Sequence, residues 1–311
     1  MKTKKAHSAR SIAVGVGPGK LDILNGEKII KFLERFAAGV NLRLVSIPIK
    51  KEHRIGFVEK SEEVGPSELE TALVERKIDI AVLRTSDVVI KASRELQRAA
   101  VTKRLTPFDA LICSNNQILD DLSLGARVAT GSLRVKAQLL HYRPDLEVIW
   151  TGVEMESQMK RMASGVIDAF VIPAADAEGL GWQDRVTEIF TTSVCLPAVG
   201  QGSLFIETRR GETGTLKLAK HLDDPVSRAE INAELFYLDA LGGASWLPAG
   251  ALGRTNGKEL VVEGFLASPD GKHLFKDTEV GRLGQERQIG ARLAERILEE
   301  GGRSILASFE V

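Results

Sequence analysis

The sequence predicts an α/β fold that consists of two sheet-and-helix domains followed by a small α+β domain. Strand-like and helix-like runs alternate over the first part of the chain, and this alternation restarts near position 106. A long helical segment, three strand-like runs and a last helix then follow. The 311 residues suffice for two or three domains, because a domain contains roughly 150 residues.

The first domain begins with a strand-like run at 10–17, and a second strand is expected at 41–50. Between them, apolar residues recur at helical spacing over 26–39, which predicts a helix. A further helix is expected at 66–77, where a proline occupies the first position, and a buried strand at 78–84. Helices between strands imply crossover connections and therefore a mainly parallel sheet.

The second domain repeats this order of elements. Strands are expected at 126–131, 146–152 and 168–175, and helices at 132–145 and 155–165. The segment after them, "LPAVGQGSLFIETR", predicts one more strand preceded by a Gly-Gln-Gly sequence that suits a hinge or crossing segment.

The third domain begins with a helix predicted within 223–243. Asp224 is the expected N-cap, Pro225 suits the first helical position, and Gly242 is the expected glycine after the helix end. A last helix is expected at 285–302. Three strands of a meander lie between these helices, at 246–253, 259–268 and 272–280. The predicted boundaries are 1–104 with 199–220 for domain 1, 105–198 for domain 2 and 221–311 for domain 3.

Composition and residue spacing exclude several classes of partner and site. Lys+Arg and Asp+Glu both number 42, so the formal net charge is zero, which argues against nucleic acid as an obligate partner. No run is long enough for a membrane span, and no signal peptide is expected at the start. The two cysteines, Cys113 and Cys195, indicate free thiols and a cytoplasmic protein. The five histidines lack metal-ligand spacing, so no metal is expected.

A strand, a Thr-Gly-Ser turn and a helix occur in "VATGSLRVKAQL", at positions 128–139. The N–H groups of the helix start, the hydroxyls of Thr130 and Ser132, and the cation of Arg134 suit an anion such as a carboxylate. An ordinary N-cap at Ser132 explains the same pattern, and the segment alone leaves both interpretations open.

Asp87 follows the carboxyl end of a buried strand, where open α/β sheets bind their ligands. A carboxylate there suits a general acid or a partner for ligand N–H groups, whereas a solvated loop aspartate is the simpler interpretation. Gly200, Gln201 and Gly202 indicate a close approach of the backbone, and we expect them to line the ligand site.

In this order, the segments "IDIAVLRTSDVV", "ATGSLRVKAQL", "LPAVGQGSLFIETR" and "LGGASWLPAG" resemble hydroxymethylbilane synthase, also called porphobilinogen deaminase. The resemblance implies two domains similar to the halves of type II periplasmic binding proteins around a cleft, plus a third domain that carries a cofactor cysteine. Family enzymes join four porphobilinogen molecules with loss of ammonia, on a dipyrromethane cofactor bound as a thioether. The resemblance also assigns Asp87 as the catalytic carboxylate that contacts pyrrole N–H groups.

The family's cofactor cysteine falls on Ala244, and a methyl group cannot form a thioether. Of two adjacent family arginines only Arg134 remains, since its neighbour is Val135. Arginines at four further family positions are also replaced. We therefore expect no dipyrromethane cofactor and a protein unable to polymerise porphobilinogen, which binds a small anionic or pyrrolic ligand or a protein partner.

Two alternatives remain. The first is an active porphobilinogen deaminase with an unusual anchor, for which Cys195 is the candidate because Cys113 lies in an apolar run that suits the core. The second is a solute-binding protein of the periplasmic type, which the third domain argues against.

Overall fold

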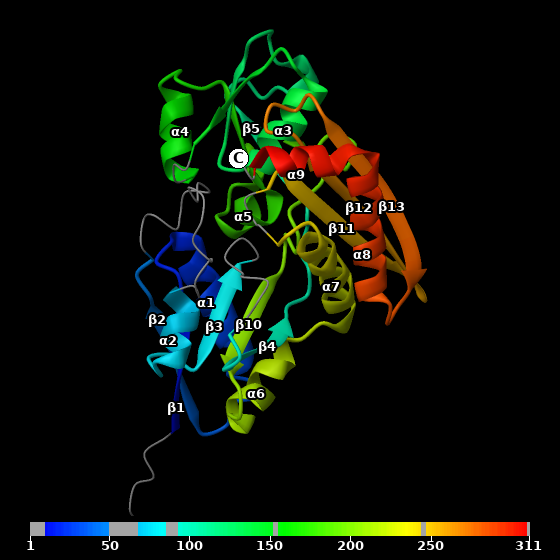
Figure 1. Ribbon diagram of the computed structural model, residues 1–311. Coiled ribbons are helices and arrows are strands. Elements are labelled where there is room, and N and C mark those ends of the chain that lie inside the picture. The colour runs from blue at the N-terminus through cyan, green and yellow to red at the C-terminus, as the bar shows by residue number, and fades with distance from the viewer. Residues whose placement is uncertain (1–9, 50–67, 85–92, 152–154, 244–246, 310–311) are drawn as a thin grey trace, which may run out of the picture. The chain divides into compact units, whose positions relative to one another are not determined.

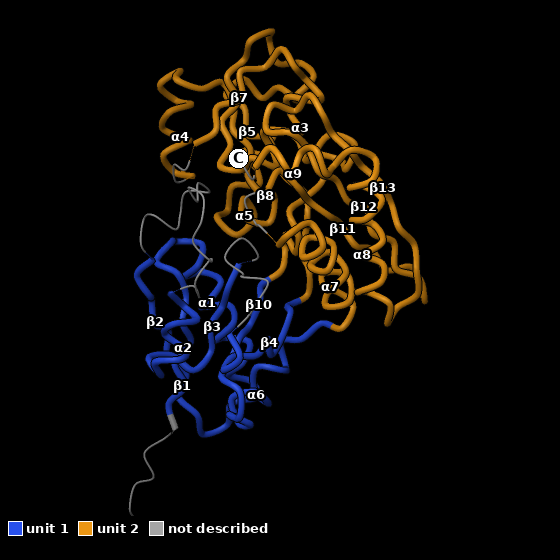
Figure 2. The backbone as a smooth tube through the Cα atoms, viewed as in Figure 1, with its two compact units in different colours: residues 1–49, 65–102, 204–224 blue, residues 50–64, 103–203, 225–311 orange. Residues whose placement is uncertain are grey.

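The structure is a computed structural model that describes residues 10–49, 68–84, 93–151, 155–243 and 247–309. The chain divides into two compact units, shown in blue and orange in Figure 2. Unit 1 contains residues 1–49, 65–102 and 204–224, and unit 2 contains residues 50–64, 103–203 and 225–311. Unit 2 thus holds most of both the second and the third predicted domains, and the three predicted boundaries stay a prediction. Asp87 and Ala244 lie outside the described residues.

Unit 1 is built on a five-stranded sheet (Figure 1). Its strands, in spatial order, are β2 (Val40–Ser46), β1 (Arg10–Val16), β3 (Ile80–Arg84), β10 (Leu204–Arg209) and β4 (Leu96–Val101). β1 pairs in parallel with β2 and β3, whereas β10 runs antiparallel to both of its neighbours. The helices of the unit are α1 (Lys20–Leu33), α2 (Glu68–Val74) and α6 (Thr213–Ala219), followed by a short 3-10 turn at Lys220–Leu222.

Helix α1 begins six residues before the expected start at Gly26. Gly19 is its N-cap, and the Gly19 N–H donates a hydrogen bond to the Asp22 carboxylate at 3.2 Å. This local cap satisfies backbone groups at the helix start without any apolar periodicity, so the pattern of apolar residues did not reveal it. The helix buries Ile29 and Leu33 against the sheet core, where Ile12, Val14 and Ile80 lie.

Unit 2 contains a second five-stranded sheet of similar design. Its strands, in spatial order, are β7 (Glu147–Trp150), β6 (Arg127–Thr130), β8 (Ala169–Pro173), β5 (Asp109–Cys113) and β9 (Glu188–Ile189). β6 pairs in parallel with β7 and β8, and β5 runs antiparallel to β8 and β9. The helices of this part are α3 (Leu133–Tyr142), α4 (Met155–Ala163) and α5 (Ala174–Gly179), and 3-10 turns occur at Leu119–Asp121 and Gln183–Arg185.

The C-terminal part of unit 2 is an antiparallel meander with helices against it (Figure 1). Its elements are α7 (Pro225–Ala240), β11 (Ala249–Asn256), β12 (Glu259–Ala267), β13 (Leu274–Arg282), α8 (Glu286–Ile297), a π-helical turn (Leu298–Gly302) and α9 (Arg303–Phe309). α7 starts at Pro225 as predicted, and Gly242 follows its end with a φ of 102°. Leu196 and Ala137 of α3 pack with Leu252 and Phe265, which joins the meander to the second sheet.

The predicted fold class is confirmed: the described residues form two α/β sheets of five strands each and a small α+β part. Both large sheets are mainly parallel, with one antiparallel strand each, β10 and β5. Within the described residues, no helix combines the length and the apolar character needed to cross a bilayer.

Candidate functional site

The turn between β6 and α3 holds two of the predicted ligand-binding hydroxyls. Ser132 is the N-cap of α3, and its hydroxyl accepts a hydrogen bond from the Val135 N–H at 3.5 Å. The Ser132 N–H in turn donates to the Thr130 hydroxyl at 3.2 Å, and Thr130 is buried. The N-cap at Ser132 is therefore confirmed, and an anion at the same turn stays a prediction.

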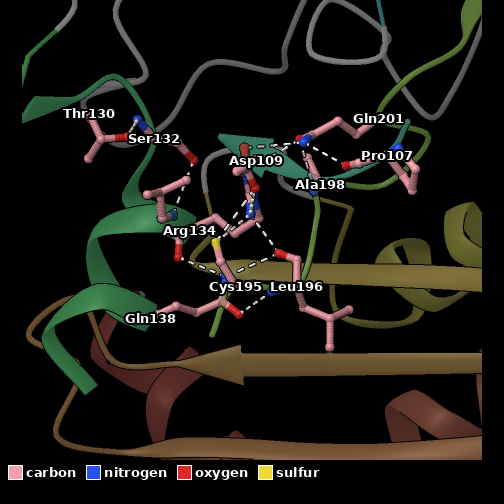
Figure 3. A network of polar contacts seen from close by, with 11 residues as sticks. Pro107, Asp109, Thr130, Ser132, Arg134, Gln138, Cys195, Leu196, Ala198 and Gln201 are labelled. Atoms are coloured by element: carbon pink, nitrogen blue, oxygen red, sulfur yellow. Dashed lines mark hydrogen bonds and ion pairs between the residues drawn. The ribbon is translucent and has the colours of Figure 1, made fainter. Parts of the chain in front are cut away.

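Arg134 is the second residue of α3 (Figure 3) and is 5% exposed. Its guanidinium forms a bidentate pair with Asp109 at the start of β5, with Nη1 to Oδ2 at 2.8 Å and Nη2 to Oδ1 at 3.0 Å. Nη1 also donates to the Leu196 carbonyl at 2.6 Å. Burial is the largest single effect and lowers the pKa of Arg134, but the charges and hydrogen bonds of Asp109 and Cys195 together outweigh burial and leave this pKa above its ordinary value. The side chain is a permanent cation with its charge balanced inside the protein.

Gln201 lies next to the same ion pair and is 6% exposed. Its amide Nε2 donates to the Pro107 carbonyl at 2.7 Å and to Asp109 Oδ1 at 3.1 Å. Its Oε1 accepts from the Ala198 N–H at 3.2 Å and from Arg134 Nη2 at 3.4 Å. Each polar atom of this amide thus has a partner within unit 2.

The glycines beside Gln201 are required by their backbone geometry. Gly200 has a φ of 70° and Gly202 a φ of 88°, both in the left-handed region. A Cβ on Gly202 would lie 2.8 Å from the Thr106 carbonyl oxygen. The expected close approach of the backbone at Gly202 is therefore to another segment of the same chain.

Sequence reasoning missed Glu234, which is fully buried on α7. Its two oxygens accept from the Gly200 N–H at 2.6 Å and the Gly253 N–H at 2.7 Å, and both pair with Arg104 at 2.8 Å. The sequence did indicate that Glu234 is buried, because it lies on the same helical face as the buried Ile231 and Leu238. A carboxylate on an apolar helix face indicates a buried partner.

Both cysteines of the chain are buried thiols without a disulfide. Cys195 is 0% exposed, its Sγ donates to Asp109 Oδ2 at 3.5 Å, and it accepts from Gln138 Nε2 and from Arg134 Nη1, each at 3.3 Å. Burial raises the pKa of Cys195 well above its usual range, and the Asp109 charge adds to this effect. Because the thiolate is the nucleophile, Cys195 is unreactive in this conformation.

Thr130, Ser132, Arg134, Gly200, Gln201 and Gly202, the predicted ligand-binding residues, all lie in unit 2. The structure brings Arg134 and Gln201 together around Asp109 (Figure 3). In the described part of the chain, no three His, Cys, Asp or Glu side chains are placed to hold a metal ion.

The family model described as "Porphobilinogen deaminase, dipyromethane cofactor binding domain" matches residues 59–217. The porphobilinogen deaminase of Pelotomaculum thermopropionicum is 35% identical over 300 residues, which cover 96% of each chain. That of Brevibacillus brevis is 33% identical and covers 94% of this chain and 96% of the relative.

A third relative, the porphobilinogen deaminase of Desulforudis audaxviator, is 40% identical over 77% of this chain and 78% of its own. Among solved structures, the methionine binding protein MetQ aligns at 15% identity with a TM-score of 0.43, over 68% of this chain and 89% of that chain.

These matches correct one expectation. The absence of a dipyrromethane cofactor, expected from Ala244, is contradicted because the matched domain is the one described as binding that cofactor. A thioether bond at position 244 still has no sulfur available, and the two thiols of the chain are both buried. Because both thiols are buried, neither is accessible for covalent attachment in the conformation described.

Proposed function

Because this chain belongs to the porphobilinogen deaminase family, we propose that it is an active porphobilinogen deaminase of tetrapyrrole biosynthesis whose dipyrromethane cofactor is attached in an unusual way. The match to the cofactor-binding domain over residues 59–217 carries this proposal. Alignment over nearly the full length of two relatives supports it, because all three parts of the family's chain are represented. Dipyrromethane, when bound, supplies the pyrrole end to which the next pyrrole is added.

The cofactor has two possible modes of binding in a chain without a cysteine at position 244. Cys195 is one candidate anchor, and its use requires the segment around residues 195–201 to move, since the thiol is 0% exposed. Reversible binding without a thioether is the other, and it requires no sulfur at all. Position 244, an alanine, is compatible with both.

The ligand is proposed to be a small pyrrole that bears carboxylates. Asp87 is proposed as the catalytic carboxylate that contacts pyrrole N–H groups, as the family resemblance implies, and it lies outside the described residues. The Thr130 and Ser132 hydroxyls are proposed to donate to a ligand carboxylate, because each hydroxyl accepts one hydrogen bond and retains a hydrogen to donate. The two unpaired thiols support a cytoplasmic location as part of this proposal.

A second candidate function is a non-catalytic pyrrole-binding protein. The alanine at position 244 favours it, since the family's anchor is lost at the one position where the resemblance places it. The two functions differ in turnover and not in binding, so an assay of ammonia release separates them.

Intact mass of the protein incubated with porphobilinogen tests the mode of attachment. Wild-type protein is compared with Cys195→Ser and with Cys113→Ser, a matched variant of the other buried thiol. An adduct that disappears only in Cys195→Ser identifies Cys195 as the anchor. Dipyrromethane that co-purifies natively but separates on denaturation identifies reversible binding. Protein that neither forms an adduct nor binds dipyrromethane in equilibrium dialysis contradicts the proposal.

A further inference from the structure

The Arg134–Asp109 pair has the geometry of an arginine bound to a ligand carboxylate. Two nitrogens of the guanidinium bond two oxygens of the carboxylate at 2.8 and 3.0 Å, the forked arrangement in which protein arginines bind carboxylates. Here the acid belongs to the protein itself and comes from β5, 25 residues away in the sequence.

Solvent does not reach this pair. The side chains of Arg134 and Asp109 are 6% and 1% exposed. Both terminal nitrogens of Arg134 are already engaged, by Asp109, by the Leu196 carbonyl and by Gln201 Oε1. Its Nε is buried and has no hydrogen-bond partner among the described residues. A ligand carboxylate therefore reaches Arg134 only by displacing Asp109 and opening the core of unit 2.

The partners of Arg134 indicate what the pair does instead. Leu196 and Gln201 belong to the segment that leads into β10, and the Cys195 thiol contacts both members of the pair. Gln138, one turn further along α3, fixes the same segment by accepting from the Leu196 N–H at 2.7 Å. The ion pair is thus the centre of a network that holds residues 195–201 against α3 and β5 (Figure 3).

We infer that Asp109 supplies, from within the chain, the carboxylate that Arg134 would otherwise take from a ligand, and that Arg134 is a positioning residue for residues 195–201. A consequence for specificity rests on the function proposed above: the acid groups of the pyrrole ligand are held by residues other than Arg134. The inference about Asp109 itself does not depend on any ligand.

Chemical rescue tests the role of Asp109. Asp109→Ala leaves a space beside a buried, uncompensated guanidinium, and formate has the size and charge to fill it. We expect the melting temperature of the variant to lie well below that of wild type. Its equilibrium constant for unfolding should be about tenfold lower in sodium formate than in sodium chloride at equal ionic strength, because a ligand stabilises the state that binds it. Wild-type protein gains no such difference, because Asp109 fills the site.

Asp168→Ala is the matched control, since Arg127 and Asp168 form a similar forked pair in the same unit but are 37% and 41% exposed. Its melting temperature should respond equally to formate and chloride. If Asp109→Ala folds only when formate is present, the inference is supported. If Asp109→Ala, or the nearly isosteric Asp109→Asn, is as stable as wild type, or if formate acts no better than chloride, the inference is wrong.

A separate binding measurement tests whether Arg134 contacts the ligand. Asp109→Asn combined with Arg134→Gln removes both charges while both amides retain hydrogen-bonding groups. We expect its dissociation constant for dipyrromethane to stay within about threefold of wild type, because no bidentate carboxylate contact is lost. A loss of about tenfold or more, at equal fold stability, would show that Arg134 binds the ligand. If wild-type protein binds no dipyrromethane, the proposed function fails while formate rescue still decides the role of Asp109.

Discussion

Glu207 on β10 and Arg98 on β4 are register partners in the sheet of unit 1, yet the shortest distance from Arg98 Nε to Glu207 Oε1 is 3.9 Å. The arginine lies over the Phe205 ring, 4.0 Å from its centroid, and Glu207 Oε2 has no hydrogen-bond partner among the described residues. Burial, and secondarily the charge of Glu70, raise the pKa of Glu207 to about 7, and Arg98 opposes the shift only in part. Below about pH 7, the native sheet therefore favours a protonated Glu207.

This raised pKa predicts a stability that declines with pH. A carboxyl whose pKa is higher in the folded than in the unfolded state stabilises fully below the unfolded value near 4.3, and this contribution is lost as the pH rises through about 7. Glu207→Gln should remove the decline between pH 5 and 8 and add about 3 kcal/mol or less to the free energy of unfolding at pH 8. Urea unfolding at several pH values measures it. An unchanged slope in the variant would refute the assignment.

Loss of the Glu234 charge should destabilise unit 2 strongly. Glu234→Gln leaves Arg104 buried without its bidentate partner, for which a cost of about 3–5 kcal/mol is expected. Glu263→Gln is the control, because Glu263 pairs with an Arg254 that is 50% exposed and should cost less than about 1 kcal/mol. If the two substitutions lower the urea midpoint equally, the buried Glu234–Arg104 pair does not make the large contribution to stability that is expected here.

Gly202 should tolerate no side chain. Gly202→Ala combines a φ of 88° with a Cβ 2.8 Å from the Thr106 carbonyl oxygen, whereas Gly211→Ala has a φ of 84° and nothing within 4 Å. The left-handed conformation alone costs roughly 1–2 kcal/mol, so Gly211→Ala should lose about that and Gly202→Ala clearly more. Thermal melts of the two variants measure the difference. Equal losses of stability would show that the close contact with the Thr106 carbonyl adds no cost.

The two thiols should resist modification in the native protein. Both are buried, and the raised pKa of Cys195 keeps it protonated at pH 8. A chromogenic disulfide reagent at this pH should label neither thiol over minutes in buffer and both in denaturing urea. Rapid labelling of Cys195 in the native protein would instead favour it as the cofactor anchor, since it would show that residues around 195–201 open readily.

Features set by neighbouring residues were predictable from the sequence, and features set by distant ones were not. The N-cap at Ser132, the first-turn proline Pro225 and the positive φ of Gly242 each depend on a few adjacent residues. The partner of Arg134 lies 25 residues away and that of Gly200 lies 34 residues away. Such pairings are determined only when strands and helices pack, because an arginine next to a helix start suits an external anion and a distant aspartate equally.

The same limit explains the error about the cofactor. One missing thiol at position 244 outweighed the many segments that match the family, although a local loss does not remove a binding domain. The sequence identified the family correctly and placed Gly202 correctly at a close backbone approach.

Ammonia release from porphobilinogen tests the proposed deaminase most directly. The purified protein, supplied with an equimolar amount of dipyrromethane, is incubated with porphobilinogen, and ammonia and remaining substrate are measured over time. The proposal predicts one ammonia released per porphobilinogen consumed, at a rate proportional to protein concentration and well above that of dipyrromethane alone. Release no faster than this blank, from protein shown to be folded and to bind dipyrromethane, would contradict it and identify a pyrrole-binding protein without catalysis.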